Sequence, residues 1–67
     1  MKNRTFKLTL SCENDAFAED MSKEIARCLR EVANYVESGN NLDKYKNVYD
    51  ANGNVVGTFA LKPADQL

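Results

Sequence analysis

The side chains in this sequence that could do chemistry are few. Its 67 residues include no histidine, so the commonest general base and metal ligand is missing. Cys12 and Cys28 would each need an activating neighbour to act as a nucleophile, and a thiol that points into a core is unreactive. Glu19 and Asp20 are adjacent carboxylates, but they fall on an exposed helix face that forms no concave site. We therefore expect no catalytic, cofactor-binding or metal-binding residue and no enzymatic activity.

Short local motifs for two other binding chemistries are also incomplete. Asn52-Gly53-Asn54 lacks the glycine spacing and the following helix of a phosphate loop. Cys12 and Cys28 do not form the CxxC pair that could begin a zinc site, and a disulfide scaffold of this size usually carries four or more cysteines. We interpret the two cysteines as reduced thiols that are buried in the core.

The composition is that of one small globular domain spanning residues 1–67. Hydrophobic residues make up 43% and charged residues 28% of the chain, which argues against disorder. Nine basic and ten acidic residues give a formal charge of −1, so charge favours neither a nucleic-acid binder nor a nucleic-acid mimic. No apolar stretch is long enough for a signal peptide or a membrane span, which predicts a cytoplasmic protein.

Two hydrophobic periodicities dominate the first half of the chain. Residues 4–12 alternate strictly between polar and apolar, which predicts a half-buried strand. Residues 15–38 carry apolar side chains at helical spacing and predict one long helix, capped at Asn14 or Asp15 and ended by Gly39. The outer face of this helix carries interleaved charges, which we interpret as a solvated surface: Glu24, Arg27, Arg30, Glu31 and Glu37.

Residues 44–61 predict a β-hairpin whose loop lies at residues 50–54. In one register Asn-Gly forms a two-residue type I′ turn, which also turns Lys46 toward the core. In the other, the loop begins with a type I turn and Gly53 is the left-handed residue of a G1 bulge. We prefer the second register because it buries Tyr45 and Tyr49. The other core positions of that register are Val55, Phe59 and Leu61.

The order strand, helix, strand, strand predicts an α+β fold. We expect a single β-α-β-β domain, in which one long helix packs on one face of a three-stranded antiparallel sheet. The expected strand order is 1-3-2, with 1-2-3 as the alternative, and residues 63–67 should form a loose tail. The other sheet face is left uncovered and is the candidate partner-binding surface. Its candidate residues are Thr5, Lys7, Thr9, Val48, Val56 and Thr58.

Four pieces of the sequence form a recognisable pattern. They are Phe6-x-Leu8-x-Leu10, Asn14-x-Ala16-Phe17, Glu24-Ile25-Ala26-Arg27-x-Leu29-Arg30-x-Val32-Ala33 and Asp50-x-Asn52-Gly53-Asn54-x-Val56-Gly57-x-Phe59. This pattern resembles a group of small uncharacterised proteins encoded by bacteriophages and prophages. The resemblance covers most of the chain and implies an accessory protein in the cytoplasm of the bacterial host, with no catalytic residue to carry over. It also favours a structural ion pair or a contact surface at Glu24, Arg27 and Arg30.

These features favour a non-enzymatic accessory protein that acts by protein–protein interaction and modulates a host or phage protein of unknown identity. Pairing of uncovered sheet faces in a homodimer is one option. The alternative is a weak nucleic-acid-binding protein whose basic residues are Lys2, Arg4, Lys7, Lys44 and Lys46. This alternative is less favoured because the aromatic rings that could stack on bases are expected in the core.

Overall fold

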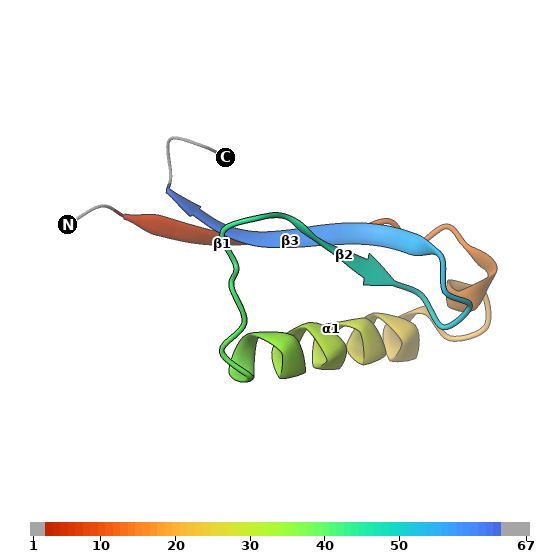
Figure 1. Cartoon of the computed structure of the whole chain (residues 1–67). Coiled ribbons are helices and arrows are strands. Elements are labelled where there is room, and N and C mark those ends of the chain that lie inside the picture. Colours follow the sequence, from red (N-terminus) through yellow and green to blue (C-terminus); the bar gives the residue numbers. More distant parts are fainter. Residues whose placement is uncertain (1–2, 64–67) are drawn as a thin grey trace.

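The computed structural model describes residues 3–63 and shows a long helix packed on one face of a three-stranded sheet (Figure 1). The elements are β1 (Arg4–Leu10), the short 3-10 helix η1 (Asp15–Phe17), α1 (Met21–Glu37), β2 (Lys46–Tyr49) and β3 (Val55–Pro63). The last strand is central, and it pairs antiparallel with both neighbours to give the order β1-β3-β2. The predicted α+β fold, element order and strand order are confirmed.

The ends of the strands differ slightly from the prediction. β1 stops at Leu10 rather than at residue 12, and β3 continues to Pro63, where it still pairs with Arg4. A proline is tolerated there because it lies at the end of the strand, where few ladder hydrogen bonds remain to be made. The rest of the expected tail, residues 64–67, lies outside the described residues.

The helix begins six residues later than predicted. Asp20 is its N-cap, and the Asp20 carboxylate accepts a hydrogen bond of 3.0 Å from the Lys23 amide. Neither Asn14 nor Asp15 caps α1, because the chain first makes the separate turn η1 and inserts Phe17 into the core with 1% of its surface exposed. Its other end is as predicted, since the helix stops at Glu37 and is followed by a left-handed glycine, Gly39, with φ of 80°.

The loop of the hairpin forms the predicted type I turn with a G1 bulge. The Gly53 amide donates to the Asp50 carbonyl at 3.0 Å, and the Asp50 amide donates to the Asn54 carbonyl at 2.9 Å. Gly53 has a φ of 86°, which is the left-handed conformation that the bulge requires. The type I′ alternative is therefore excluded.

The preferred register beyond this loop is wrong, because the hairpin contains a second irregularity. Tyr49 pairs with Val55, but Val48 pairs with Gly57, so Val56 is an extra residue on β3. An extra residue shifts the parity of every later pair by one and moves each side chain to the other face. Val48 therefore turns toward the helix, and Tyr45 and Tyr49 turn away from it.

Gly57 follows the extra residue and lies against the backbone of β1. A Cβ placed on Gly57 would overlap the carbonyl oxygen of Thr9. The absent side chain lets β1 approach β3 closely, and it is the neighbouring strand, rather than the helix, that fills the space.

The core lies between α1 and the sheet near the bulge. Cross-strand rows on the helix side join Leu8, Phe59 and Lys46, and then Leu10, Gly57 and Val48. The buried core residues are Phe17, Cys28, Val32, Val48, Val56 and Phe59. Tyr35 adds an edge-to-face contact with Phe59, with ring centroids 5.5 Å apart.

Candidate functional site

The sheet face turned away from α1 is the first candidate site, and we call it the open sheet face. Alternation along the three strands places on it Thr5, Lys7, Thr9, Tyr45, Asn47, Tyr49, Val55, Thr58, Ala60 and Lys62, of which Ala60 is fully buried. Four of the six residues predicted for this surface are present. Thr5, Lys7 and Thr9 are exposed on β1, and Thr58 is half-buried on β3.

The other two predicted residues, Val48 and Val56, do not belong to this face. Their exposed fractions are only 4% and 6%, and both lie in the core cluster. The bulge at Val56 is the physical reason, because it reverses the faces of β2 relative to the expected register. These two valines are therefore core residues and are not available to a partner on this face.

Three large side chains that the sequence analysis placed in the core occupy this face instead. Tyr45, Tyr49 and Val55 are 50%, 47% and 54% exposed. Lys62 extends over the Tyr45 ring, with its Nζ 5.4 Å from the ring centroid, which is a cation–π geometry. Gly57 was the sequence signal that could have predicted this exposure, because an isolated glycine inside a strand often marks a bulge.

Charge is unevenly distributed between the sheet and the rest of the domain. The three strands carry Arg4, Lys7, Lys46 and Lys62 and no acidic residue. On the open sheet face the charged side chains are Lys7 and Lys62, so the face is cationic although the chain as a whole has a charge of −1. The open sheet face therefore has a positive potential although the net charge of the chain is small.

The basic residues predicted for nucleic-acid binding do not form one surface. Lys7 lies on the open sheet face, whereas Arg4 and Lys46 lie on the side of the sheet that faces α1. Lys44 is exposed in the loop before β2, and Lys2 lies outside the described residues.

A polar cluster connects α1 to the hairpin loop. Glu24 is 7% exposed, and its carboxylate pairs with Arg27 through two hydrogen bonds of 2.9 Å. It also accepts the Ala51 amide at 2.9 Å, and Arg27 donates to the Tyr49 carbonyl at 3.0 Å. The interpretation of Glu24 as a solvated residue is wrong, because this carboxylate is needed to satisfy a backbone amide of the loop.

A second buried carboxylate organises the loop from within. Asp50 is 4% exposed and accepts hydrogen bonds from the amides of Asn52 and Asn54, each at 2.9 Å, and from the Asn14 side chain at 3.1 Å. Asn14, the α1 residues Glu24 and Arg27, and the hairpin loop thus meet at one place in the fold. Because no buried polar side-chain atom of the described residues lacks a partner, the cluster has a structural role.

The titration of this cluster follows from its contacts. Hydrogen bonds from Arg27 outweigh burial and lower the pKa of Glu24. Burial alone would raise the pKa of Asp50, but the hydrogen bonds from Asn54, Asn14 and Asn52 outweigh it, so this pKa is also lowered. Both groups therefore stay ionised at neutral pH, and neither is poised to donate or accept a proton in catalysis.

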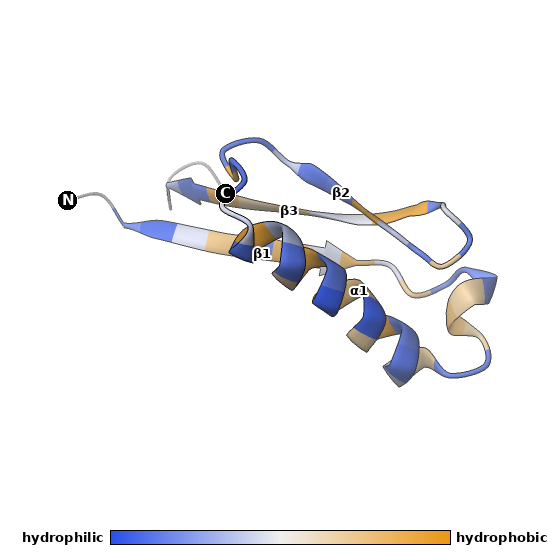
Figure 2. Cartoon of the chain, turned by 60° about the horizontal axis from the view of Figure 1, so that its bottom comes forward, coloured by the Kyte–Doolittle hydropathy of each residue, from blue (hydrophilic) through white to orange (hydrophobic). Residues whose placement is uncertain are grey.

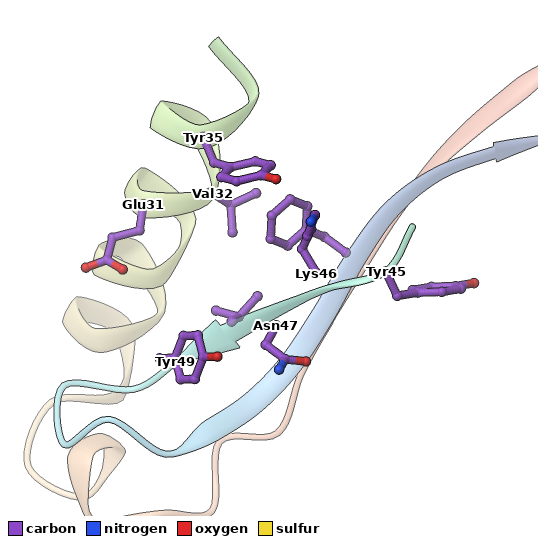
Figure 3. Close-up of a pocket in the computed structure, with 9 residues that line it drawn as sticks. Glu31, Val32, Tyr35, Tyr45, Lys46, Asn47 and Tyr49 are labelled. Carbon is purple, nitrogen blue, oxygen red and sulfur yellow. The ribbon is translucent and has the colours of Figure 1, made fainter. Parts of the chain in front are cut away.

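A groove of about 470 Å³ lies between α1 and the free edge of β2. Figure 3 shows Val32 and Tyr35 of α1 and Lys46 of β2 converging in it, whereas Tyr45 points away from the helix. Lys46 pairs with Phe59 in the register, and a long amphipathic side chain at such a position can cover an aromatic ring while its ammonium group reaches water. The groove contains no nucleophile with an adjacent base.

The cysteines do not form a reactive site. Cys28 is fully buried beside the Glu24–Arg27 pair, and burial raises the pKa of its thiol. Cys12 is half-buried, and both thiols are free. Within residues 3–63, no group of three or more histidine, cysteine or acidic side chains could hold a metal ion. In the same part of the chain, no helix is both long and apolar enough to cross a membrane.

Comparisons with models of known protein families, with curated proteins and with solved structures find no match to this chain.

Proposed function

We propose that this chain is a non-enzymatic accessory protein of phage or prophage origin that acts in the bacterial cytoplasm by binding another protein through its open sheet face. The observation that supports this is the exposure of Tyr45, Tyr49 and Val55 together on one side of a small sheet. Tyrosine is enriched at protein interfaces because a large ring can be buried while its hydroxyl still makes a hydrogen bond.

The charge of the face indicates the kind of partner. Lys62 lies over the Tyr45 ring and Lys7 is on β1 of the same face, and the strands contribute no carboxylate to oppose these two charges. A protein surface with acidic residues around an apolar centre would be complementary to this arrangement. The threonines add hydroxyl groups that can form hydrogen bonds at the rim of such an interface.

Affinity capture from a bacterial lysate tests this proposal. Tagged protein is incubated with nuclease-treated lysate, and bound proteins are identified and quantified by mass spectrometry. We expect one stoichiometric partner, with at least a tenfold lower recovery for Tyr45→Ser, because truncation of a hot-spot tyrosine costs about 2 kcal/mol or more and about 1.4 kcal/mol is a factor of ten in affinity. Lys23→Ser, an exposed change on α1, is the matched control and should recover the partner normally. Equal recovery by all three proteins would refute the assignment of this face.

Single-stranded nucleic acid is a second candidate ligand of the same face, and one structural observation favours it. Tyr45 and Tyr49 are not in the core but half-exposed, and Tyr45 lies beside Lys62. Exposed rings next to cationic side chains are the chemistry by which sheets stack and hold unpaired bases. This candidate predicts binding to an oligonucleotide that weakens steeply with salt, because neutralised phosphates release counterions. Binding that is absent, or insensitive to salt, would remove it.

A further inference from the structure

The outer edge of β1 carries a row of backbone groups that point away from the sheet. The Ser11 amide donates to the Val56 carbonyl at 2.7 Å, so Ser11 faces β3. Successive residues of an antiparallel strand point their backbone groups to alternate sides. The N–H and C=O groups of Phe6, Leu8 and Leu10 are therefore directed outward, and within residues 3–63 no hydrogen bond to them is found.

The opposite edge of the sheet, formed by β2, is less available for pairing with another strand. β2 has only four residues. The outward carbonyl group of its last residue, Tyr49, already accepts a hydrogen bond from Arg27. β1 has seven residues, and among residues 3–63 no side chain donates a hydrogen bond to its outward carbonyl groups. A long open edge next to apolar side chains readily pairs with another strand.

An apolar groove lies directly beside this open edge. α1 approaches the sheet most closely at β2, which leaves a space of about 570 Å³ between α1 and β1. Its walls include Phe6 and Leu29, which are 42% and 45% exposed. Figure 2 shows hydrophobic segments of β1 alongside hydrophobic segments of α1. The groove and the edge together form a surface that both backbone and side chains of a partner could complete.

We propose that the partner is a second copy of this chain, bound through antiparallel pairing of the two β1 strands about a two-fold axis at Leu8. This register places Leu8 opposite its counterpart and Phe6 opposite Leu10, so the outward backbone groups of all three residues find partners. Lys7 then faces Thr9 of the other copy. The proposal concerns a different surface from the open sheet face and does not depend on the function proposed for it.

Charge selects this register over the nearest alternative. A two-fold axis at Lys7 would place the two Lys7 side chains directly opposite each other, and like charges in such pairs are destabilising. It would also place Arg4 opposite Leu10 on the helix side. An axis at Thr9 would place Phe6 opposite Cys12, which lies beyond the end of β1, so the outward backbone groups of Phe6 would find no strand partner. The axis at Leu8 avoids all three problems and forms a six-stranded sheet with both helices on the same side.

The size of the contact predicts a reversible dimer. β1 contributes seven residues and α1 contributes five from the groove: Leu29, Val32, Ala33, Val36 and Glu37. This is about half of the 20–30 residues per side in a standard interface, so we expect a weak dimer that dissociates on dilution.

Sedimentation velocity over a range of concentrations measures the association. We expect a shift from 7.5 kDa to twice that mass, and loss of the shift in Leu29→Lys, which places a charge in the groove. Met21→Lys is the matched control, because Met21 is similarly exposed on α1 but outside the groove, and it should dimerise like the wild type. A wild-type chain that remains monomeric at every concentration would overturn the proposal, as would equal dimerisation of both variants.

Hydrogen exchange of the wild-type chain tests the register without any substitution. The amides of Phe6, Leu8 and Leu10 should exchange at least tenfold more slowly at concentrations where the dimer forms. Those of Lys7 and Thr9, which point toward β3, should change little. A dimer whose formation leaves the Phe6, Leu8 and Leu10 amides unprotected would overturn the proposed pairing.

Discussion

The bulge in the β2–β3 hairpin determines which residues lie on the open sheet face. Two single variants, Val56→Ala and Val55→Ala, test this bulge. Val56 is 6% exposed and Val55 is 54% exposed. Val→Ala removes the equivalent of two methylene groups, which costs about 1.6 kcal/mol when the side chain is fully buried. The cavity left at Val56 raises the expected loss to about 2 kcal/mol.

Val55→Ala is the matched control, because it is the same chemical change on the same strand. About half of the Val55 side chain is already in water, so the expected loss is about 0.7 kcal/mol. For a domain of this size the melting temperature should fall by about 8–16 °C in Val56→Ala and by about 3–6 °C in Val55→Ala. Calorimetry and urea denaturation of the two variants measure these differences.

The opposite ranking would refute the assigned register. A regular hairpin without the bulge would bury Val55 and expose Val56, and the larger loss would then belong to Val55→Ala. Equal losses would also contradict the structure, because they would indicate that the two side chains are similarly buried.

Three further predictions concern the close strand contact, the polar cluster and the cysteines. Gly57→Ala should prevent folding or lower the melting temperature more than Val56→Ala does, because its Cβ would overlap a β1 carbonyl; a melting temperature within 3 °C of wild type would contradict this. The lowered pKa values of Glu24 and Asp50 should stabilise the fold fully above the pH at which free carboxyl groups titrate, about pH 4, with loss as the pH falls through the lower folded-state values. Urea titrations from pH 2 to 7 should therefore show a weaker acid dependence in Glu24→Gln, and an unchanged dependence would refute this origin. In the native protein at pH 8, Cys28 should react with a thiol reagent more slowly than Cys12, because burial raises the pKa of the Cys28 thiol; equal rates would contradict the burial.

The architecture could be predicted because its signals are periodic and local. Alternation in residues 4–12 and helical spacing after residue 20 depend on burial of one face, which repeats along each element. The left-handed residues Gly39 and Gly53 were also predictable, since positive φ angles favour glycine. The start of α1 was not, because several acidic and amide side chains could cap it and only the docking of Phe17 decides among them.

The candidate surface was predicted only in part, and a single extra residue accounts for the difference. Thr5, Lys7 and Thr9 were placed correctly because β1 pairs with β3 without interruption. Val48 and Tyr49 were exchanged between faces because the bulge lies beyond the turn, where turn chemistry no longer determines the register. The burial of Glu24 could not be predicted locally either, because the amide that it binds belongs to Ala51, 27 positions away in the sequence.

Photo-crosslinking from Tyr45 in bacterial cells tests the proposed protein-binding face most directly. A photoreactive phenylalanine derivative replaces Tyr45 in one preparation and the exposed Lys23 of α1 in another. The proposed function predicts a discrete protein adduct from position 45 that is absent from position 23. No adduct from position 45, the same adduct from both positions, or an adduct with nucleic acid would contradict it.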